Sequence, residues 1–218
     1  MSSGAEPAAD LVNTLISGGE KAFKNFYRLS NGAWLDHAPE YFLTSHAAAA
    51  FHGSEKTGAW LEASVFETRA EAAAINRGRP HPEERRNGRY DIVLYWANGT
   101  PRAAVEVKSP LWYADVSRLG PDFSRLCRTL SSASDSTFQF CVFLYYASVA
   151  EPERTHSNAR QRMLETIKRI NSHATESAKK HGLAMVPITG RIHRSKKEGA
   201  WVVAAGVFVR TGGERAFS

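Results

Sequence analysis

The dipeptide Asn98-Gly99 constrains the fold of this 218-residue chain more than any other feature. It separates two segments rich in β-branched and aromatic residues, 89–97 (RYDIVLYWA) and 101–108 (PRAAVEVK). Asn-Gly between such segments is the strongest short-range indication of a β-hairpin with a two-residue loop. We therefore predict two antiparallel strands joined by a tight turn at positions 98 and 99.

The register of this hairpin brings charged side chains together. With a two-residue loop at positions 98 and 99, Asp91 lies opposite Glu106. Opposed side chains in an antiparallel pair are about 5 Å apart at their Cβ atoms. Because side chains alternate between the two faces of a strand, Glu106 and Lys108 share one face. The sequence predicts a cluster of Asp91, Glu106 and Lys108 on one side of the hairpin.

Two opposed carboxylates weaken a hairpin unless a cation offsets their repulsion. Mg²⁺ typically takes one or two carboxylates from a protein and keeps its other positions for water or substrate phosphate oxygens. A neighbouring amine can then position water for attack on a phosphodiester. Asp91, Glu106 and Lys108 are therefore candidate catalytic residues. The alternative is a strand start near solvent at Asp91, with Glu106 and Lys108 as an edge pair that prevents aggregation.

The strings YDIVL at residues 90–94 and VEVKS at residues 105–109 resemble the core motif of the PD-(D/E)xK nuclease superfamily, also called restriction-endonuclease-like. The resemblance implies that Asp91 and Glu106 bind the metal, Mg²⁺ or Mn²⁺, together with the backbone carbonyl of Val107. It also implies that Lys108 assists the attacking water. Tyr90 stands where the superfamily often has a proline.

The superfamily core runs α, β, β, β, α, β, and this chain predicts the same order. The expected elements are a helix at 36–51 capped by Asp36, a strand at 60–69, the hairpin, a helix at 121–130 and a continuous apolar strand at 138–146. Glu62 and the alanines around it leave a helix as the alternative at 60–69. A strand, helix, strand succession predicts a right-handed crossover and a parallel strand pair. The nuclease-like core would span residues 36–147.

Further elements flank this core. They are an amphipathic helix at 20–29 within an N-terminal extension of residues 1–35, a helix at 158–181, and strands at 183–189 and 201–209 within residues 148–218. We expect an α/β fold with a mixed central sheet flanked by helices. No shift in composition marks a linker, so residues 1–218 are expected to form a single domain.

Glu40, in the first turn of the helix at 36–51, is a further candidate ligand. The resemblance implies a metal-binding glutamate on this helix. The alternative is that Glu40 only interacts with the positive end of the helix dipole. Glu62 is the substitute ligand if the segment from residue 60 is helical.

Two basic stretches could bind nucleic-acid phosphates beside this cluster. Residues 76–89 lead directly into the strand that carries Asp91, and residues 190–199 separate the last two predicted strands. The candidate phosphate-binding residues are Arg85, Arg86, Arg89, Arg194, Lys196 and Lys197. The alternative is that both stretches are simply polar loops.

A formal net charge of +6 and a pI near 9.4 favour a polyanionic partner. The first twelve residues lack a basic region followed by an apolar stretch, so we expect no secretory signal, no membrane span and a cytoplasmic location. Cys127 and Cys141 lie on apolar stretches and are expected to be reduced core residues.

These observations predict a Mg²⁺-dependent nuclease that hydrolyses DNA, an endonuclease or exonuclease. Cutting both strands of a duplex calls for two active sites, and hence a homodimer or a larger assembly. The alternative is a catalytically inactive nuclease-like module that binds nucleic acid or a protein partner. An enzyme acting on small phosphorylated molecules is a third possibility, but no glycine-rich phosphate loop follows any expected strand.

Overall fold

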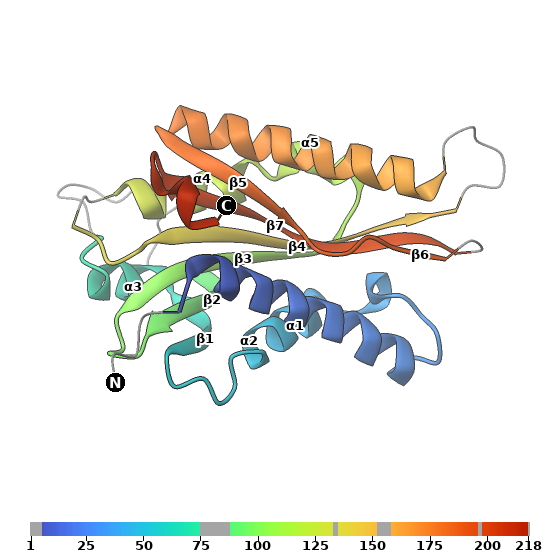
Figure 1. Ribbon diagram of the computed structural model, residues 1–218, viewed down its shortest axis with the longest axis horizontal. Coiled ribbons are helices and arrows are strands. Elements are labelled where there is room, and N and C mark those ends of the chain that lie inside the picture. The colour runs from blue at the N-terminus through green and yellow to red at the C-terminus, as the bar shows by residue number, and fades with distance from the viewer. Residues whose placement is uncertain (1–5, 75–87, 133–134, 152–157, 196–197, 218) are drawn as a thin grey trace.

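The architecture is a curled, mixed seven-stranded sheet with helices on both faces (Figure 1). The structure, a computed structural model, describes residues 6–74, 88–132, 135–151, 158–195 and 198–217. The strand order is β1-β2-β3-β4-β7-β5, and β6 pairs with β7. The pairs β1–β2, β2–β3, β4–β7 and β5–β7 are antiparallel and β3–β4 is parallel. The predicted α/β fold with a mixed central sheet flanked by helices is confirmed.

The strands are β1 (Thr57–Ser64), β2 (Arg89–Trp96), β3 (Pro101–Leu111), β4 (Phe140–Ala150), β5 (Leu183–Thr189), β6 (His193–Ser195) and β7 (Gly199–Arg210). The helices are α1 (Ala8–Leu29), α2 (Glu40–Ala49), α3 (Val65–Glu71), α4 (Gly120–Ser131) and α5 (Ala159–Lys180). Short 3-10 turns are η1 (Leu35–His37), η3 (Tyr113–Arg118) and η4 (Gly213–Phe217). Helices α1 and α2 cover one face of the sheet, and α4 and α5 cover the other (Figure 1).

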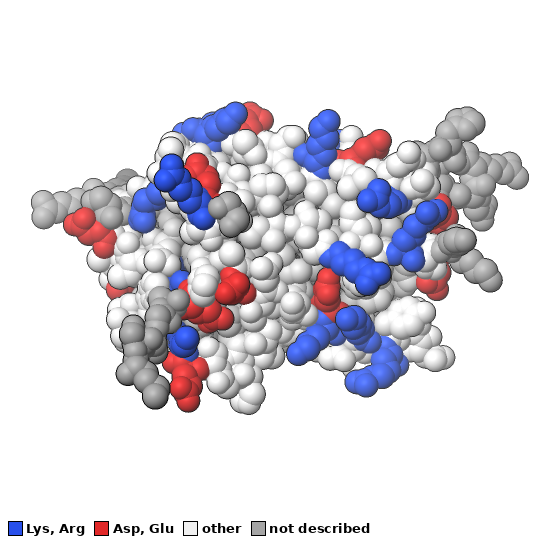
Figure 2. All heavy atoms as spheres, in the orientation of Figure 1, with Lys and Arg blue, Asp and Glu red and all other residues white. Residues whose placement is uncertain are grey.

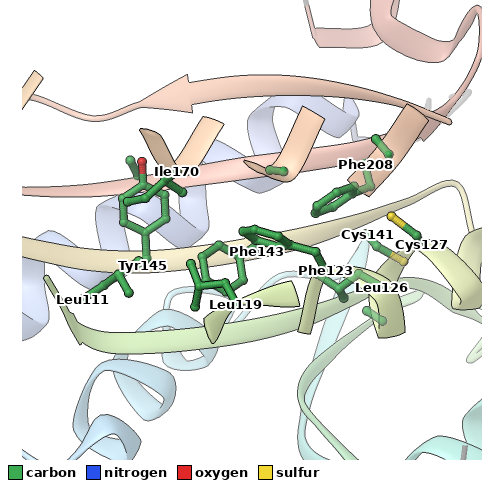
Figure 3. Packing of buried hydrophobic residues seen from close by; sticks show 14 of the residues in the cluster. Leu111, Leu119, Phe123, Leu126, Cys127, Cys141, Phe143, Tyr145, Ile170 and Phe208 are labelled. Atoms are coloured by element: carbon green, nitrogen blue, oxygen red, sulfur yellow. The ribbon is translucent and has the colours of Figure 1, made fainter. Parts of the chain in front are cut away.

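Each face of the sheet has its own apolar core, because side chains alternate along the strands. Val105 and Val107 of β3 pack against α1 and α2, while Phe143 of β4 packs on the opposite face. Figure 3 shows this second core, where the Phe123 and Phe143 rings meet edge to face at 4.8 Å. Cys127 and Cys141 are buried and free within the same core, as expected.

The β2–β3 hairpin has the predicted register but not the predicted turn. Ile92 pairs with Val105, the partner that a two-residue loop would give it. The loop nevertheless has three residues, since the Trp96 N–H donates to the Thr100 carbonyl at 2.9 Å. A β-bulge after Leu94 shifts the register back by one residue. The prediction of a two-residue turn was wrong, and the bulge compensates for the difference.

The helix predicted at 36–51 begins later, at Glu40, and Asp36 is not its cap. Asp36 lies in η1, and its carboxylate accepts hydrogen bonds from the hydroxyls of Tyr146, at 3.3 Å, and Ser148. Pro39 occupies the N-cap position of α2 instead. Asp36 therefore ties this segment to the end of β4, a long-range role that local sequence does not reveal.

The segment predicted as a strand at 60–69 is strand and helix in succession. It follows β1 as far as Ser64, whose side chain accepts a hydrogen bond from the Glu67 N–H at 3.4 Å and caps α3. Helix α3 therefore lies between β1 and β2. It adds one element to the predicted α, β, β, β, α, β order, which α2, β1, β2, β3, α4 and β4 otherwise follow.

The N-terminal helix is longer than predicted, because α1 starts at Ala8 rather than at residue 20. It packs closely on α2 at Gly18, where an added Cβ would lie 2.7 Å from the His46 carbonyl oxygen. The helix predicted at 158–181 is confirmed as α5, which Asn158 caps through the Gln161 N–H. The two C-terminal strands extend the sheet as predicted.

Candidate active site

Among the described residues, the C-terminal half of β3 has no paired strand on the side that faces β2. The β2–β3 ladder ends at Ile92 and Val105, whereas β3 continues to Leu111. Its other edge pairs with β4 as far as Lys108 and again at Leu111. Within the described part of the chain, no strand pairs with the β2-facing edge of β3 beyond Val105. We refer to residues 106–109 of β3 as the open edge.

Two carboxylates take the place of a strand along the open edge. The Val107 N–H donates to Asp91 Oδ2 at 2.7 Å, and the Ser109 N–H donates to Glu40 Oε2 at 3.0 Å. These N–H groups are two residues apart, about 6.6 Å along an extended strand. Asp91 from β2 and Glu40 from α2 therefore lie side by side, with backbone donors fixing one oxygen of each.

Asp91 reaches this position because β2 changes faces at it. Residues two apart in a strand normally share a face. Tyr90, however, packs in the core beneath α4, and Ile92 packs in the core beneath α1 and α2. The β1–β2 pairing is interrupted at the same level, where Glu62 has a φ of 54°. Asp91 thus belongs to neither core, and its carboxylate lies between β2 and β3.

Glu106 is the most deeply buried carboxylate of the site. Its side chain is 2% exposed, and its Oε2 accepts a hydrogen bond from Arg125 Nη2 of α4 at 2.5 Å. Its Oε1 is buried without a hydrogen-bond partner among the described residues. Burial raises the pKa of Glu106 well above its ordinary value; the positive charge of Arg125 opposes this shift and the negative charge of Asp91 adds to it.

The surroundings of Asp91 also disfavour its ionised form, and its pKa is raised. Partial burial raises the pKa of its carboxyl, the hydrogen bond from Val107 lowers it, and the charge of Glu40 raises it further. Glu62 acts on Asp91 in the same direction as Glu40. The negative charges of Asp91 and Glu106 beside the open edge are therefore only partly offset by nearby positive groups.

Lys108 is a positively charged residue close to these carboxylates. Its Nζ lies 3.6 Å from Glu40 Oε1, and a third of its side chain is exposed. Partial burial lowers the pKa of Lys108, but nearby carboxylates outweigh that effect and the pKa lies above its ordinary value. These carboxylates belong to Glu40, Asp122, Asp91 and Glu106. The side chain is accordingly an ammonium group that donates hydrogen bonds and does not accept protons.

Sequence reasoning brought together Glu40, Asp91, Glu106 and Lys108 but missed two members of the site. Asp122 and Arg125 lie one turn apart on α4, where Arg125 bonds Asp122 Oδ1 at 3.1 Å and Glu106 on β3. Their spacing in the sequence places them on one helix face. Nothing in the sequence, however, indicates which strand that face would meet.

The donor set suits a hard divalent cation. Mg²⁺ takes oxygen ligands, and one or two carboxylates from the protein suffice. Asp91, Glu106 and the Val107 carbonyl would hold it, with Glu40 as a further ligand. The unpartnered Glu106 Oε1 and the excess of carboxylates over cations are what such a cation would satisfy. Among the described residues, no three His, Cys, Asp or Glu side chains form a ready-made metal centre.

Of the six candidate phosphate-binding residues, the structure places two. Arg89 Nη1 donates to the Glu62 carbonyl at 2.9 Å, beside Asp91, and Arg194 lies 3.9 Å from Glu151. Arg85, Arg86, Lys196 and Lys197 lie outside the described residues. On the face shown in Figure 2, basic side chains gather toward the end where Figure 1 places the last turns of α1 and β6. None of the described helices is apolar over enough of its length to cross a bilayer.

No family model, curated protein or solved structure matches this chain. The resemblance to the PD-(D/E)xK superfamily therefore rests on Asp91, Glu106 and Lys108 and on the order of the elements that carry them.

Proposed function

We propose that this protein is a Mg²⁺-dependent nuclease of the PD-(D/E)xK type that hydrolyses phosphodiester bonds in DNA. The observation that supports this most is the open edge of β3. There Asp91 accepts the Val107 N–H, and the buried Glu106 precedes Val107 in β3. The charges of Asp91 and Glu106 both help to raise the pKa of Lys108. A polyanionic substrate also suits the net charge of +6.

Each side chain has a distinct role in this proposal. Asp91 and Glu106 would hold the cation, which when bound would stabilise negative charge on the attacking and leaving oxygens. The Lys108 ammonium donates a hydrogen bond to the attacking water and orients it toward phosphorus. Hydrolysis joins the water oxygen to phosphorus and breaks one phosphorus–oxygen bond to a sugar. The water gives up a proton to solvent, and the leaving oxygen takes one up.

Arg125 has a positioning role. Its guanidinium bonds Glu106 and Asp122 at once, so it fixes the buried carboxylate from the α4 side. This leaves Glu106 Oε1 as the oxygen that can bind a cation. Arg125 thereby lets Glu106 remain in an otherwise apolar core.

A second candidate is a catalytically inactive nuclease-like module that binds nucleic acid or a protein partner. The short Arg125–Glu106 contact favours it, since an arginine already supplies a positive charge to the deepest carboxylate. In that case Lys108 and Arg125 alone would neutralise the nearby carboxylates, and no metal ion would bind. Such a module would bind its partner equally well with and without divalent cations.

A cleavage assay separates the two candidates. Supercoiled, linear and single-stranded DNA are incubated with Mg²⁺, Mn²⁺, Ca²⁺ or chelator, beside the Lys108→Ala variant. We expect cleavage with Mg²⁺ or Mn²⁺ and a loss of about 100- to 1,000-fold in Lys108→Ala, the size of effect expected when one positioned donor is removed. DNA binding should stay nearly intact, because Lys108 faces several acids and is not part of a basic surface.

Lys180→Ala is the matched control. Lys180 lies at the end of α5, where its ammonium pairs with the exposed Glu176. We expect this variant to cleave like the parent protein. Equal cleavage by Lys108→Ala and the parent would overturn the catalytic role of Lys108.

A further inference from the structure

A pocket of about 910 Å³ opens at the carboxyl ends of the parallel strands β3 and β4. Its lining comes from Ser148 and Val149 of β4, from Trp34 and the η1 segment, and from the first turns of α5 with Arg162. Pockets outside the carboxyl ends of parallel strands are common ligand sites in α/β proteins.

The pocket borders the open edge without sharing its carboxylates. Trp112, in its lining, follows Lys108 by four residues, and His37, also in its lining, precedes Glu40 by three. Four extended residues span at most about 13 Å. A group that lies in the pocket can therefore belong to the same strand of nucleic acid as a phosphate at the open edge.

Exposed aromatic rings line the mouth of the pocket. The side chains of Trp112 and Tyr113 are 50% and 52% exposed. The Arg169 guanidinium carbon lies over the Tyr113 ring, 4.3 Å from its centroid, and adds a positive charge beside the pocket. Aromatic rings and arginine planes are the surfaces on which proteins stack unpaired nucleobases.

Polar groups in the pocket complement the edge of a base. Arg162 Nε is buried without a hydrogen-bond partner among the described residues, while its Nη2 donates to the Ala150 carbonyl and fixes the side chain. The carboxylates of Glu165 and Glu198 lie in the same lining. Arg162, Glu165 and Glu198 thus bring hydrogen-bond donors and acceptors to one lining, which suits a ligand that carries both kinds of group, as the edges of nucleobases do.

We propose that this pocket binds an unpaired nucleobase of the strand that lies across the open edge. The proposal rests on the proposed nuclease function for the identity of that strand. A base can enter only if it has left its stack and its pairing partner. The substrate at this site is therefore single-stranded DNA, or duplex opened at the point of cleavage.

Binding measurements with single-stranded oligodeoxynucleotides test this without requiring cleavage. Affinities are measured by fluorescence anisotropy in chelator for the parent, Trp112→Ala and Trp60→Ala. Trp60, on β1, is 67% exposed and lies outside this pocket. Each protein is titrated with a normal strand and with a strand of the same length that carries abasic sites. Trp112→Phe, which keeps an aromatic ring, guards against a folding defect.

We expect Trp112→Ala to bind the normal strand about tenfold more weakly, the loss expected for one base–aromatic stack. Its affinity for the abasic strand should equal that of the parent, and Trp60→Ala and Trp112→Phe should bind both strands like the parent. Equal weakening on both strands, or no weakening, would overturn the nucleobase pocket.

The outcomes also separate this proposal from the nuclease function. If the parent protein cleaves DNA and Trp112→Ala binds DNA like the parent, the nucleobase pocket is overturned and the nuclease function stands. A parent protein that shows the base-dependent loss at Trp112 but never cleaves would keep the pocket and remove the nuclease.

Discussion

The β4–β7 ladder and the open edge of β3 belong to one sheet but differ most in strand pairing and in charge. Strand β4 pairs with β7 without interruption from Phe140↔Val209 to Ala150↔Gly199, and both strands are buried and mainly apolar. At the open edge, carboxylates accept the backbone hydrogen bonds that a strand would otherwise take. The backbone N–H groups of Val107 and Ser109 have acceptors, as those of the ladder do, but only the open edge places charged groups in the interior. Stability is thus concentrated in one region and the proposed chemistry in the other.

The largest effect on stability is expected in the β4–β7 region. Phe143 is fully buried and packs edge to face on Phe123. We expect Phe143→Ala to lower the free energy of unfolding by about 3–5 kcal/mol, because it removes a large apolar side chain and leaves a cavity. Urea denaturation measures this. A loss below about 1 kcal/mol would mean that this core is not the stable part of the sheet.

The next effect concerns pH and Glu106. Burial raises the pKa of Glu106 in the folded protein above its unfolded value, so the folded state favours the protonated acid. Stability from this group is fully present below the unfolded pKa and is lost as pH rises through the folded pKa. The loss is about 1.4 kcal/mol for each unit of pKa difference. The metal-free protein therefore loses stability at this site as pH rises.

Glu106→Gln measures that loss. Unfolding free energies of the variant and the parent are compared in chelator at about pH 5 and about pH 8. We expect the difference to shift in favour of the variant at the higher pH, and excess Mg²⁺ to restore the parent. Glu176→Gln is the control, because Glu176 is exposed and its pKa is lowered by Lys180. If the difference in unfolding free energy between variant and parent does not change with pH, the pKa of Glu106 is not raised by folding.

The smallest effect concerns the hairpin turn. Gly99 has a φ of 80°, and an added Cβ would meet no described atom within 4 Å. Gly99→Ala should therefore cost about 1 kcal/mol through backbone strain alone. Gly120→Ala, at the first position of α4 without a positive φ, is the control that should cost nothing. Cleavage should be unchanged in both, since the core side chains fix the pairing of Ile92 with Val105. Reduced cleavage in Gly99→Ala would show that the turn sets the register.

Much of the fold follows from local sequence, and the errors have identifiable causes. The apolar run at 138–146, the helical pattern at 158–181 and the strand alternation at 101–108 predicted the corresponding elements correctly. The start of α2 was wrong because Asp36 bonds Ser148 at a distant position in the chain. The turn was wrong because the β-bulge after Leu94 offsets a longer loop, and alternation alone cannot distinguish these cases.

The candidate site divides in the same way. The positions of Glu106 and Lys108 on β3 follow from the period of two, which is a local property. The position of Asp91 does not, because β2 changes faces there and Asp91 bonds the Val107 N–H where pairing with Glu106 was predicted. The sequence pointed to Glu40, but not to its hydrogen bond with the Ser109 N–H, which depends on how α2 packs. Asp122 and Arg125 come from a helix on the far side of a crossover, so their contact with Glu106 depends on tertiary packing.

Calorimetric titration of Mn²⁺ into the parent and Asp91→Asn tests the open edge as a cation site most directly. Asparagine keeps an oxygen that can accept the Val107 N–H and removes the charge beside Glu40. We expect Mn²⁺ to bind the parent and to bind Asp91→Asn more than about tenfold more weakly, with an unfolding midpoint no lower than that of the parent. Equal Mn²⁺ affinity in the two proteins would contradict a cation site at the open edge.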